Sequence, residues 1–250
     1  FRAKTGEFLA EGPQAVREAL ASDRPPIEVF VTDDASARHP GLEAAARAAG
    51  VEWHVVTDDV VAEIADSVTP QGVVARCPSL VRTLDHVPAA ARLVVVCHEI
   101  RDPGNVGAVI RCADAAGAEA VVLTGDCVDP QGPKAVRATA GSLFHLPVVV
   151  HRDHHEVVAL LQDRGVQVLA ADGGGDRGLF DVELDLTRPT AWVMGNEARG
   201  MTDEVRAAAD HVVSVPILGR AESLNLATAA AVCLYASARA QLQGTVPDGT

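Results

Sequence analysis

The sequence predicts an α/β protein whose C-terminal part is built on a parallel sheet. Strand-like and helix-like patterns alternate along the chain, which is typical of parallel sheets joined by right-handed crossovers. The run Leu93–Cys97 is apolar without interruption, as a parallel strand buried on both faces requires. The 250 residues are 48% hydrophobic but only 3% aromatic, so we expect a core of aliphatic side chains.

The first 77 residues are expected to form a small α/β domain. Val16 and Leu20 lie four residues apart, on one face of an amphipathic helix. Residues 78–91 contain two prolines and no sustained apolar period, which indicates a linker. The expected strands span residues 7–10, 27–31, 51–56 and 72–77, and the expected helices span 12–20, 41–49 and 59–65.

The second domain is expected to span residues 92–250. After the strand at 93–97, strand and helix patterns alternate again. Further strands are expected at 120–123, 146–150, 166–171, 191–194 and 212–215. Helices are expected at 106–116, 133–140 and 156–163, from 203, and from about 223 to 241.

The charge balance limits how this chain could bind nucleic acid. Its net charge of −13 argues against binding over the whole surface, because attraction to phosphate needs local positive potential. A confined basic face stays open, since several cations lie in or near the polar segments described below. These are Arg101, Arg111, Lys134, Arg137, Arg199 and Arg220.

Cysteine and histidine spacing gives no sign of a metal site. The five cysteines form no CxxC pair, so we expect reduced thiols in a cytoplasmic protein. His151, His154 and His155 lack a cysteine or carboxylate at the spacing of a zinc site. No apolar run is long enough to span a bilayer, and no signal-peptide pattern is visible. We therefore expect neither a metal nor membrane association.

Three short glycine-containing segments each follow a predicted strand: 102–107, 195–200 and 215–225. In open α/β sheets, ligands bind outside the carboxyl ends of the strands. A P-loop nucleotidase is not expected because no GxxxxGK[ST] occurs, and the GxGxxG of a dinucleotide fold is absent after the first long strand. Gly173–Gly175 is bordered by Asp172 and Asp176, which would repel pyrophosphate, so a flexible loop is expected there.

These segments together resemble the three signature motifs of the SpoU/TrmH family, in the SPOUT superfamily of RNA methyltransferases. The first reads Asp-Pro-Gly-Asn-Val-Gly with Arg111, the second Gly-Asn-Glu with Gly200, and the third Val-Pro-Ile-Leu-Gly followed by Glu-Ser-Leu-Asn. Residues 134–144 also match a stretch of the family. The opening, residues 8–20, is similar to the ribosomal-protein-like substrate-binding domain that precedes many of these enzymes. The resemblance implies a deep trefoil knot in residues 92–250, which periodicity alone does not predict.

The resemblance also implies a cofactor and a set of site residues. S-adenosylmethionine is expected to bind Gly195, Asn196, Gly200, Val215, Ile217, Leu218, Gly219 and Leu224. Catalytic roles are implied for Asn105, Arg111, Glu197, Ser223 and Asn225, and RNA contacts for Lys134 and Arg137. We expect Arg111 to stabilise negative charge on the attacking oxygen, because a guanidinium stays protonated, and Asn105 to hold Arg111 or contact phosphate. Ala198 and Arg199 depart from the family, where a glycine is common.

The function implied is 2′-O-ribose methylation of structured RNA. Ribosomal RNA is favoured over transfer RNA because of the N-terminal domain. The resemblance further implies a homodimer in which Arg111 of one subunit faces the cofactor of the other. Three alternatives stay open: a transfer-RNA methyltransferase, a catalytically silent RNA-binding or ribosome-assembly factor, and a small-molecule methyltransferase on the same scaffold. Methyl transfer from labelled cofactor to RNA separates them.

Overall fold

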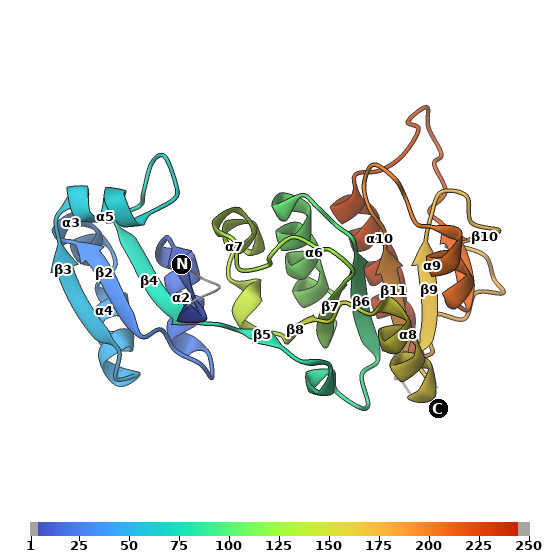
Figure 1. The fold of residues 1–250 in the computed structure, drawn as a ribbon, viewed down its shortest axis with the longest axis horizontal. Coiled ribbons are helices and arrows are strands. Elements are labelled where there is room, and N and C mark those ends of the chain that lie inside the picture. The colour runs from blue at the N-terminus through green and yellow to red at the C-terminus, as the bar shows by residue number, and fades with distance from the viewer. Residues whose placement is uncertain (1–4, 245–250) are drawn as a thin grey trace.

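The computed structural model describes residues 5–244 as two α/β units that lie side by side (Figure 1). The first unit has a mixed sheet in the order β1-β4-β2-β3, in which β4 is antiparallel to both neighbours and β2 is parallel to β3. Its strands are β1 (Glu7–Glu11), β2 (Glu28–Thr32), β3 (Glu52–Val56) and β4 (Val73–Pro78). Its helices are α2 (Pro13–Ala21), α3 (Asp33–Arg38), α4 (Pro40–Ala48) and α5 (Asp58–Ile64).

Helix α3 was not predicted, and its start has a local explanation. The Thr32 hydroxyl caps the helix by accepting a hydrogen bond from the Ala35 backbone N–H at 3.2 Å. Asp33 and Asp34 follow in the first turn, where the helix dipole favours negative charge. Because this six-residue helix buries only Ala35, it has too few apolar side chains to produce a visible period.

The second unit contains an eight-stranded sheet in the order β10-β12-β9-β11-β6-β7-β8-β5, with every neighbouring pair parallel. The predicted parallel sheet is therefore confirmed, while the knot stays a prediction. The strands are β5 (Val81–Arg82), β6 (Leu93–His98), β7 (Ala120–Thr124), β8 (Val148–Val150), β9 (Gln167–Ala171), β10 (Arg177–Gly178), β11 (Thr190–Met194) and β12 (His211–Ser214). Strands β5 and β10, of two residues each, were not predicted.

Helices cover both faces of this sheet. They are α6 (Pro103–Ala115), α7 (Pro133–Thr139), α8 (His154–Asp163), α9 (Asp203–Ala208) and α10 (Leu226–Gly244), with 3-10 turns at Leu84–His86 and Ser142–Phe144. In β6, Leu93, Val95 and Cys97 join the core formed with α6 and α10. Val94 and Val96 join the opposite core, formed with α8 and α9. This double burial explains why β6 is apolar at every position.

The two units share one hydrophobic cluster. Phe8 of β1 stacks on Phe144 of the second unit with ring centroids 6.1 Å apart, and both belong to the core that includes β6. Residues 78–91, the expected linker, include β5, which pairs with β8 at the edge of the large sheet. The domain limits 1–77, 78–91 and 92–250 stay a prediction, but the contact between the units is well packed.

None of the five cysteines forms a disulfide. Cys77, Cys97 and Cys233 are buried and the other two are half-buried. Burial raises the pKa of the Cys77 and Cys233 thiols to about 12, so they are unreactive core side chains. Within residues 5–244, no helix combines the length and apolarity needed to cross a membrane.

A buried histidine makes the stability of the second unit depend on pH. His154, at the start of α8, is 5% exposed, and burial, followed by the nearby His98 and His155, lowers its pKa from 6.5 to about 4. The unfolded chain therefore binds a proton between pH 6.5 and pH 4 that the folded protein does not bind. The free energy of unfolding is therefore not reduced by His154 above pH 6.5, and it falls as the pH drops toward 4.

We expect His154 to lower the free energy of unfolding by about 2 kcal/mol when the pH falls from 7.5 to 5. Urea unfolding of the wild type and of His154→Leu at both pH values measures it. The variant should lose less stability on acidification than the wild type by about that amount. Equal losses in the two proteins would show that His154 titrates normally in the fold.

Candidate functional site

The first motif connects β6 to α6, and its aspartate fixes the start of the helix. The Asp102 carboxylate caps α6 by accepting a hydrogen bond from the Asn105 backbone N–H at 2.9 Å. The Lys134 ammonium lies 2.9 Å from its other oxygen. Lys134, and then the Asn105 N–H, lower the pKa of Asp102, so the cap stays ionised. Asn105 is thereby held at the first turn of α6, at the carboxyl end of β6.

The second motif is a tight turn after β11. Gly200 has a φ of +67°, which favours glycine, and its N–H donates to the Asn196 carbonyl at 2.9 Å. The Asn196 side-chain oxygen accepts from the backbone N–H groups of Ala198 and Arg199, both at 3.0 Å. Ala198 and Arg199 are exposed, so the substitution that departs from the family lies on the solvent side of the turn.

Side chains from all three motifs meet in one hydrogen-bonded chain. The Asn105 amide donates to the Glu197 carboxylate at 2.8 Å, across 92 residues of sequence. The Asn225 amide donates to the Asn105 side-chain oxygen at 3.2 Å, across 120 residues. A further bond, from the Asn196 amide to the Glu99 carbonyl at 2.7 Å, ties the second motif to the segment before the first. The carboxyl ends of neighbouring strands β6 and β11 therefore carry one polar centre.

Asn225 also determines where the last helix begins. Its side-chain oxygen accepts from the Ala227 N–H at 2.9 Å and the Thr228 N–H at 3.4 Å, as an N-cap does. Helix α10 therefore starts at Leu226, three residues later than predicted. Ser223 precedes the cap in an exposed segment, and no hydrogen bond to its side chain occurs in the part of the chain that the structure describes.

Arg111 lies away from this centre. It follows Asn105 by six residues on α6, which places the two side chains about 120° apart around the helix axis at roughly 100° per residue. Arg111 is exposed and, within residues 5–244, forms no hydrogen bond or ion pair. Asn105 contacts Glu197 and Asn225 rather than Arg111. The guanidinium is therefore presented to solvent.

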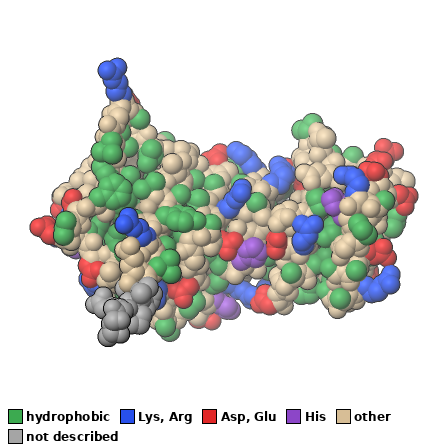
Figure 2. All heavy atoms as spheres, turned by 180° about the vertical axis from the view of Figure 1, so that it is seen from behind, with side chains coloured by type: hydrophobic (Ala, Val, Ile, Leu, Met, Phe, Trp, Pro, Cys, Tyr) green, Lys and Arg blue, Asp and Glu red, His purple; other side chains and the backbone are tan. Residues whose placement is uncertain are grey.

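The third motif forms a segment that projects beyond the sheet between β12 and α10 (Figure 1). Val215 is half-buried against the core, but Leu218 is 93% exposed, and Ile217 and Leu224 are also exposed. Figure 2 shows the projection from behind, with basic side-chain atoms at its tip. Exposed apolar side chains beside bare glycine backbone suit a flat, partly apolar ligand.

Residues 172–175 lie near the site, which the sequence did not predict, because their position follows from the order of the strands in the sheet. Strand β9 lies between β11 and β12, so residues 172–175 lie between the second and third motifs. A Cβ added to Gly200 would lie 3.8 Å from the Asp172 carboxylate. This segment, for which the sequence predicted a loop, forms a turn in which the Gly174 N–H donates to the Asp172 carboxylate at 2.8 Å and the Gly175 N–H to the Asp172 carbonyl at 3.0 Å.

The two cations expected to bind RNA both have partners within the protein. Lys134 pairs with Asp102 and its side chain is 61% exposed. Arg137 pairs with Glu11 at 3.4 Å and with Asp66 at 3.0 Å, both in the first unit. Arg137 therefore joins α7 to the N-terminal unit, while Lys134 stays accessible beside the first motif. RNA contact by either residue stays a prediction.

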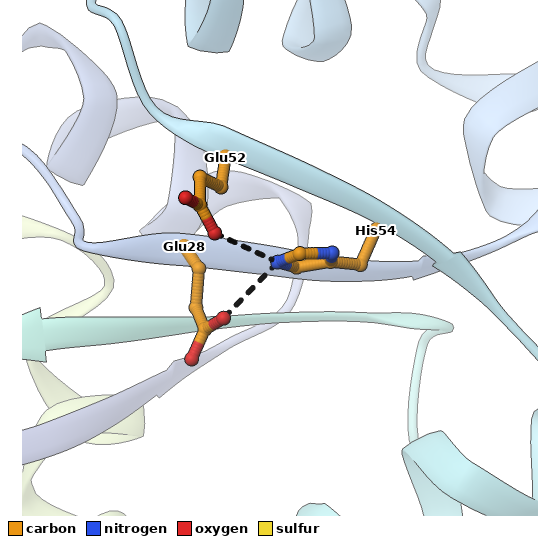
Figure 3. Close-up of side chains that lie close together, drawn as sticks. All are labelled: Glu28, Glu52 and His54. Carbon is orange, nitrogen blue, oxygen red and sulfur yellow. Dashed lines mark hydrogen bonds and ion pairs between the residues drawn. The ribbon is translucent and has the colours of Figure 1, made fainter.

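In the described residues, one group of side chains has the spacing of metal ligands, and it lies far in sequence from the motifs. Glu28, Glu52 and His54 meet on the first sheet, with His54 Nε2 at 3.0 Å from Glu28 and 3.4 Å from Glu52 (Figure 3). Arg76 also binds Glu28, at 2.6 Å, and pairs with Glu7. These cross-strand pairs link all four strands of the sheet, a role that needs no ion.

Both halves of the chain match known families. The description "SpoU rRNA Methylase family" covers residues 92–235, and "MRM3-like substrate binding domain" covers residues 1–75. The Bacillus subtilis (strain 168) 23S rRNA (guanosine(2553)-2'-O)-methyltransferase RlmP is 36% identical, over 94% of this chain and 89% of that protein. The Streptomyces viridochromogenes 23S rRNA (uridine(2479)-2'-O)-methyltransferase is 31% identical, over 97% of this chain and 86% of that protein.

Solved structures agree with this match. The SpoU methyltransferase AviRb from Streptomyces viridochromogenes, in complex with AdoMet, has a TM-score of 0.85 and 31% identity, covering 97% of this chain and 94% of that one. An AdoMet-bound rRNA methyltransferase from Sinorhizobium meliloti has a TM-score of 0.80 and 30% identity, covering 95% and 89%. The family predicted from three short motifs is confirmed by the match over residues 92–235, and the protein belongs to the SpoU rRNA methylase family.

Proposed function

We propose that this protein transfers a methyl group from S-adenosylmethionine to a ribose 2′-hydroxyl of 23S ribosomal RNA. The observation that carries the proposal is the hydrogen-bonded chain of Glu197, Asn105 and Asn225, which joins all three motifs at the carboxyl ends of the strands. Relatives named as 23S rRNA 2′-O-methyltransferases match nearly the full length of the chain, and this supports ribosomal over transfer RNA.

The residues present fit the cofactor. Gly200 has positive φ, and a side chain at Gly219 would meet open space, so backbone is accessible on both motif loops. Exposed Ile217 and Leu224 supply apolar surface that a flat adenine ring would cover. We assign Gly195, Asn196, Gly200, Val215, Ile217, Leu218, Gly219 and Leu224 to its binding. When bound, the cofactor supplies an electrophilic methyl group.

The side chains of the site then align and activate the ribose. A 2′-hydroxyl is a weak nucleophile at neutral pH and needs its developing negative charge stabilised. Arg111 supplies a permanent positive charge for this. We assign Asn105 and Glu197, which are fixed by their mutual hydrogen bond, to orient the hydroxyl. Ser223 and Asn225 border the same centre, at the start of α10.

A homodimer would bring Arg111 to a site. Within one chain Arg111 faces away from Asn105, as described above. Next to it, α10 carries exposed Tyr235 and Leu242, and the Tyr235 hydroxyl donates to the Ala115 carbonyl of α6 at 3.2 Å. Figure 2 shows hydrophobic side chains across the face below the projecting segment. We propose that this face binds a second copy, whose site receives Arg111, and that the dimer works in the cytoplasm.

Transfer of tritiated methyl groups to unmodified RNA tests the function. We expect incorporation into 23S rRNA transcribed in vitro, at a 2′-oxygen identified by resistance of one phosphodiester to alkaline hydrolysis. Transfer-RNA transcripts should accept no label. RNA binding without transfer would identify a silent binding factor, and preferential labelling of transfer RNA would overturn the substrate assignment. Transfer to small molecules without RNA would overturn the RNA methyltransferase itself.

A further inference from the structure

A pocket of about 310 Å³ opens at the carboxyl ends of β7 and β8, beside the first motif. Its walls are mainly apolar, and one of them, Val150, is 42% exposed although it ends a strand. Polar groups at the pocket come from Asp126, Asp129 and Arg152. The complete lining consists of Val81, Leu123, Gly125, Asp126, Cys127, Val128, Asp129, Pro130, Val150 and Arg152.

Hydrogen bonds hold the floor of this pocket against the segment that leads into the first motif. The Val128 N–H donates to the Ile100 carbonyl at 3.0 Å. The Ile100 N–H donates to the Cys127 sulfur at 3.3 Å, and burial raises the pKa of that thiol to about 11, so it stays protonated. Gly125 has a φ of +66°, and a Cβ there would lie 2.8 Å from Glu99 Cγ. The pocket is therefore preformed, and a ligand would bind it without ordering a loop.

The pocket lies between the N-terminal unit and the polar centre of the motifs. Strand order places β7 and β8 on the side of β6 away from β11, and β5, which brings the chain from the first unit, pairs with β8. An RNA strand that follows the sheet from the first unit to Asn105 would pass over the carboxyl ends of β8 and β7. The pocket is on that route.

Charged side chains of both signs lie at the pocket, where Arg152, Asp126 and Asp129 are part of the lining. Arg101 is 56% exposed and pairs with Asp126 at 2.7 Å. Arg152 is exposed, and Lys134, at the first motif, is 61% exposed. Positive side chains beside an apolar slot match a nucleotide, whose phosphate is anionic and whose base has two apolar faces.

We propose that this pocket holds one unpaired nucleobase of the RNA substrate, close in sequence to the methylated nucleotide. The base would lie between aliphatic side chains, including Val150 and Val128, with a neighbouring phosphate on Arg152. Carboxylates at the pocket would accept hydrogen bonds from base N–H groups. The inference rests on the proposed function and adds a subsite that reads a base which is not itself modified.

Filling the pocket tests this. Val150→Trp places an indole where the base would lie, and Arg152→Glu reverses an exposed charge at the pocket. With 23S rRNA transcribed in vitro, we expect each to raise KM for RNA about tenfold, the scale of one lost base contact. The Kd for S-adenosylmethionine and the thermal midpoint should stay at wild-type values. Because Arg152 is exposed, its variant decides the question if Val150→Trp fails to fold.

Matched controls lie between β10 and β11, outside the lining of the pocket. Val182→Trp adds an indole at a fully exposed site, and Arg188→Glu reverses an exposed charge just before β11. Both should retain wild-type KM. If the wild type methylates the transcript and both pocket variants keep its KM, the subsite is wrong while the proposed function stands. If the wild type transfers no methyl group to RNA, the proposed function fails, and the subsite with it.

Discussion

Arg111→Ala should reduce methyl transfer about a thousandfold, the effect of removing one group that stabilises transition-state charge. Arg111 is exposed and, in the described residues, has no partner within its own chain, so its loss leaves no buried group unsatisfied. Affinity for S-adenosylmethionine and thermal stability should therefore stay unchanged. Single-turnover transfer and cofactor titration measure the two effects. An equal loss of cofactor affinity would show that Arg111 has a structural role.

Mixing two inactive variants tests whether Arg111 acts in the partner's site. Asn105→Ala removes the group that joins Glu197 to Asn225 and should also inactivate the protein. If each site combines Asn105 of one subunit with Arg111 of the other, an equimolar, re-equilibrated mixture regains roughly a quarter of wild-type activity, because half the dimers carry one intact site. As a control, Arg47→Ala changes an exposed arginine on α4 that pairs with Glu43, and its equimolar mixture with either inactive variant should keep roughly half of wild-type activity, because this variant's own dimers stay fully active and half the dimers carry one intact site. Absence of rescue would contradict the action in trans.

Gly107→Ala should destabilise the protein and impair the site together. Helix α6 passes so close to α7 that a Cβ at position 107 would overlap the Ala135 carbonyl oxygen and lie 2.6 Å from Ala138 Cβ. The better helix propensity of alanine, about 1 kcal/mol, is outweighed by overpacking against backbone, typically 1–3 kcal/mol. The helices have to separate, which moves Asn105 and Arg111. The midpoint temperature of thermal unfolding and the rate of methyl transfer should both fall, the rate by tenfold or more.

Gly41→Ala is the matched control. Gly41 also lies in a helix, α4, and a Cβ there would meet nothing within 4 Å. This variant should be as stable as the wild type or slightly more stable. A Gly107→Ala protein with wild-type stability and activity would show that α6 and α7 are further apart than described.

The elements that the sequence predicted are those whose cause is local. The apolar run of β6 indicated a strand buried on both faces, and the two cores on either side of it confirm this. The motifs were recognisable because glycine, asparagine and arginine occur at fixed spacings. Neither required knowledge of which strands are neighbours.

What the sequence did not predict depends on long-range contacts. The ion pairs of Arg137 with the first unit were not predicted, because its partners Glu11 and Asp66 are 126 and 71 residues away. Asp172 lies beside the second motif only because β9 pairs with both β11 and β12. Asn225 was placed inside a helix, whereas its hydrogen bonds to Ala227 and Thr228 make it the cap. Pairing over such distances leaves no periodicity in the sequence.

The stacking of Phe8 on Phe144 within a shared core has a consequence for how large an RNA is measured. Swinging the two halves apart would expose these rings to water, which costs free energy in proportion to the apolar area uncovered. The distance between the N-terminal unit and the polar centre of the motifs is therefore fixed. If the N-terminal unit binds the RNA, as its family match suggests, only an RNA whose own fold spans that distance would bring its ribose to the site.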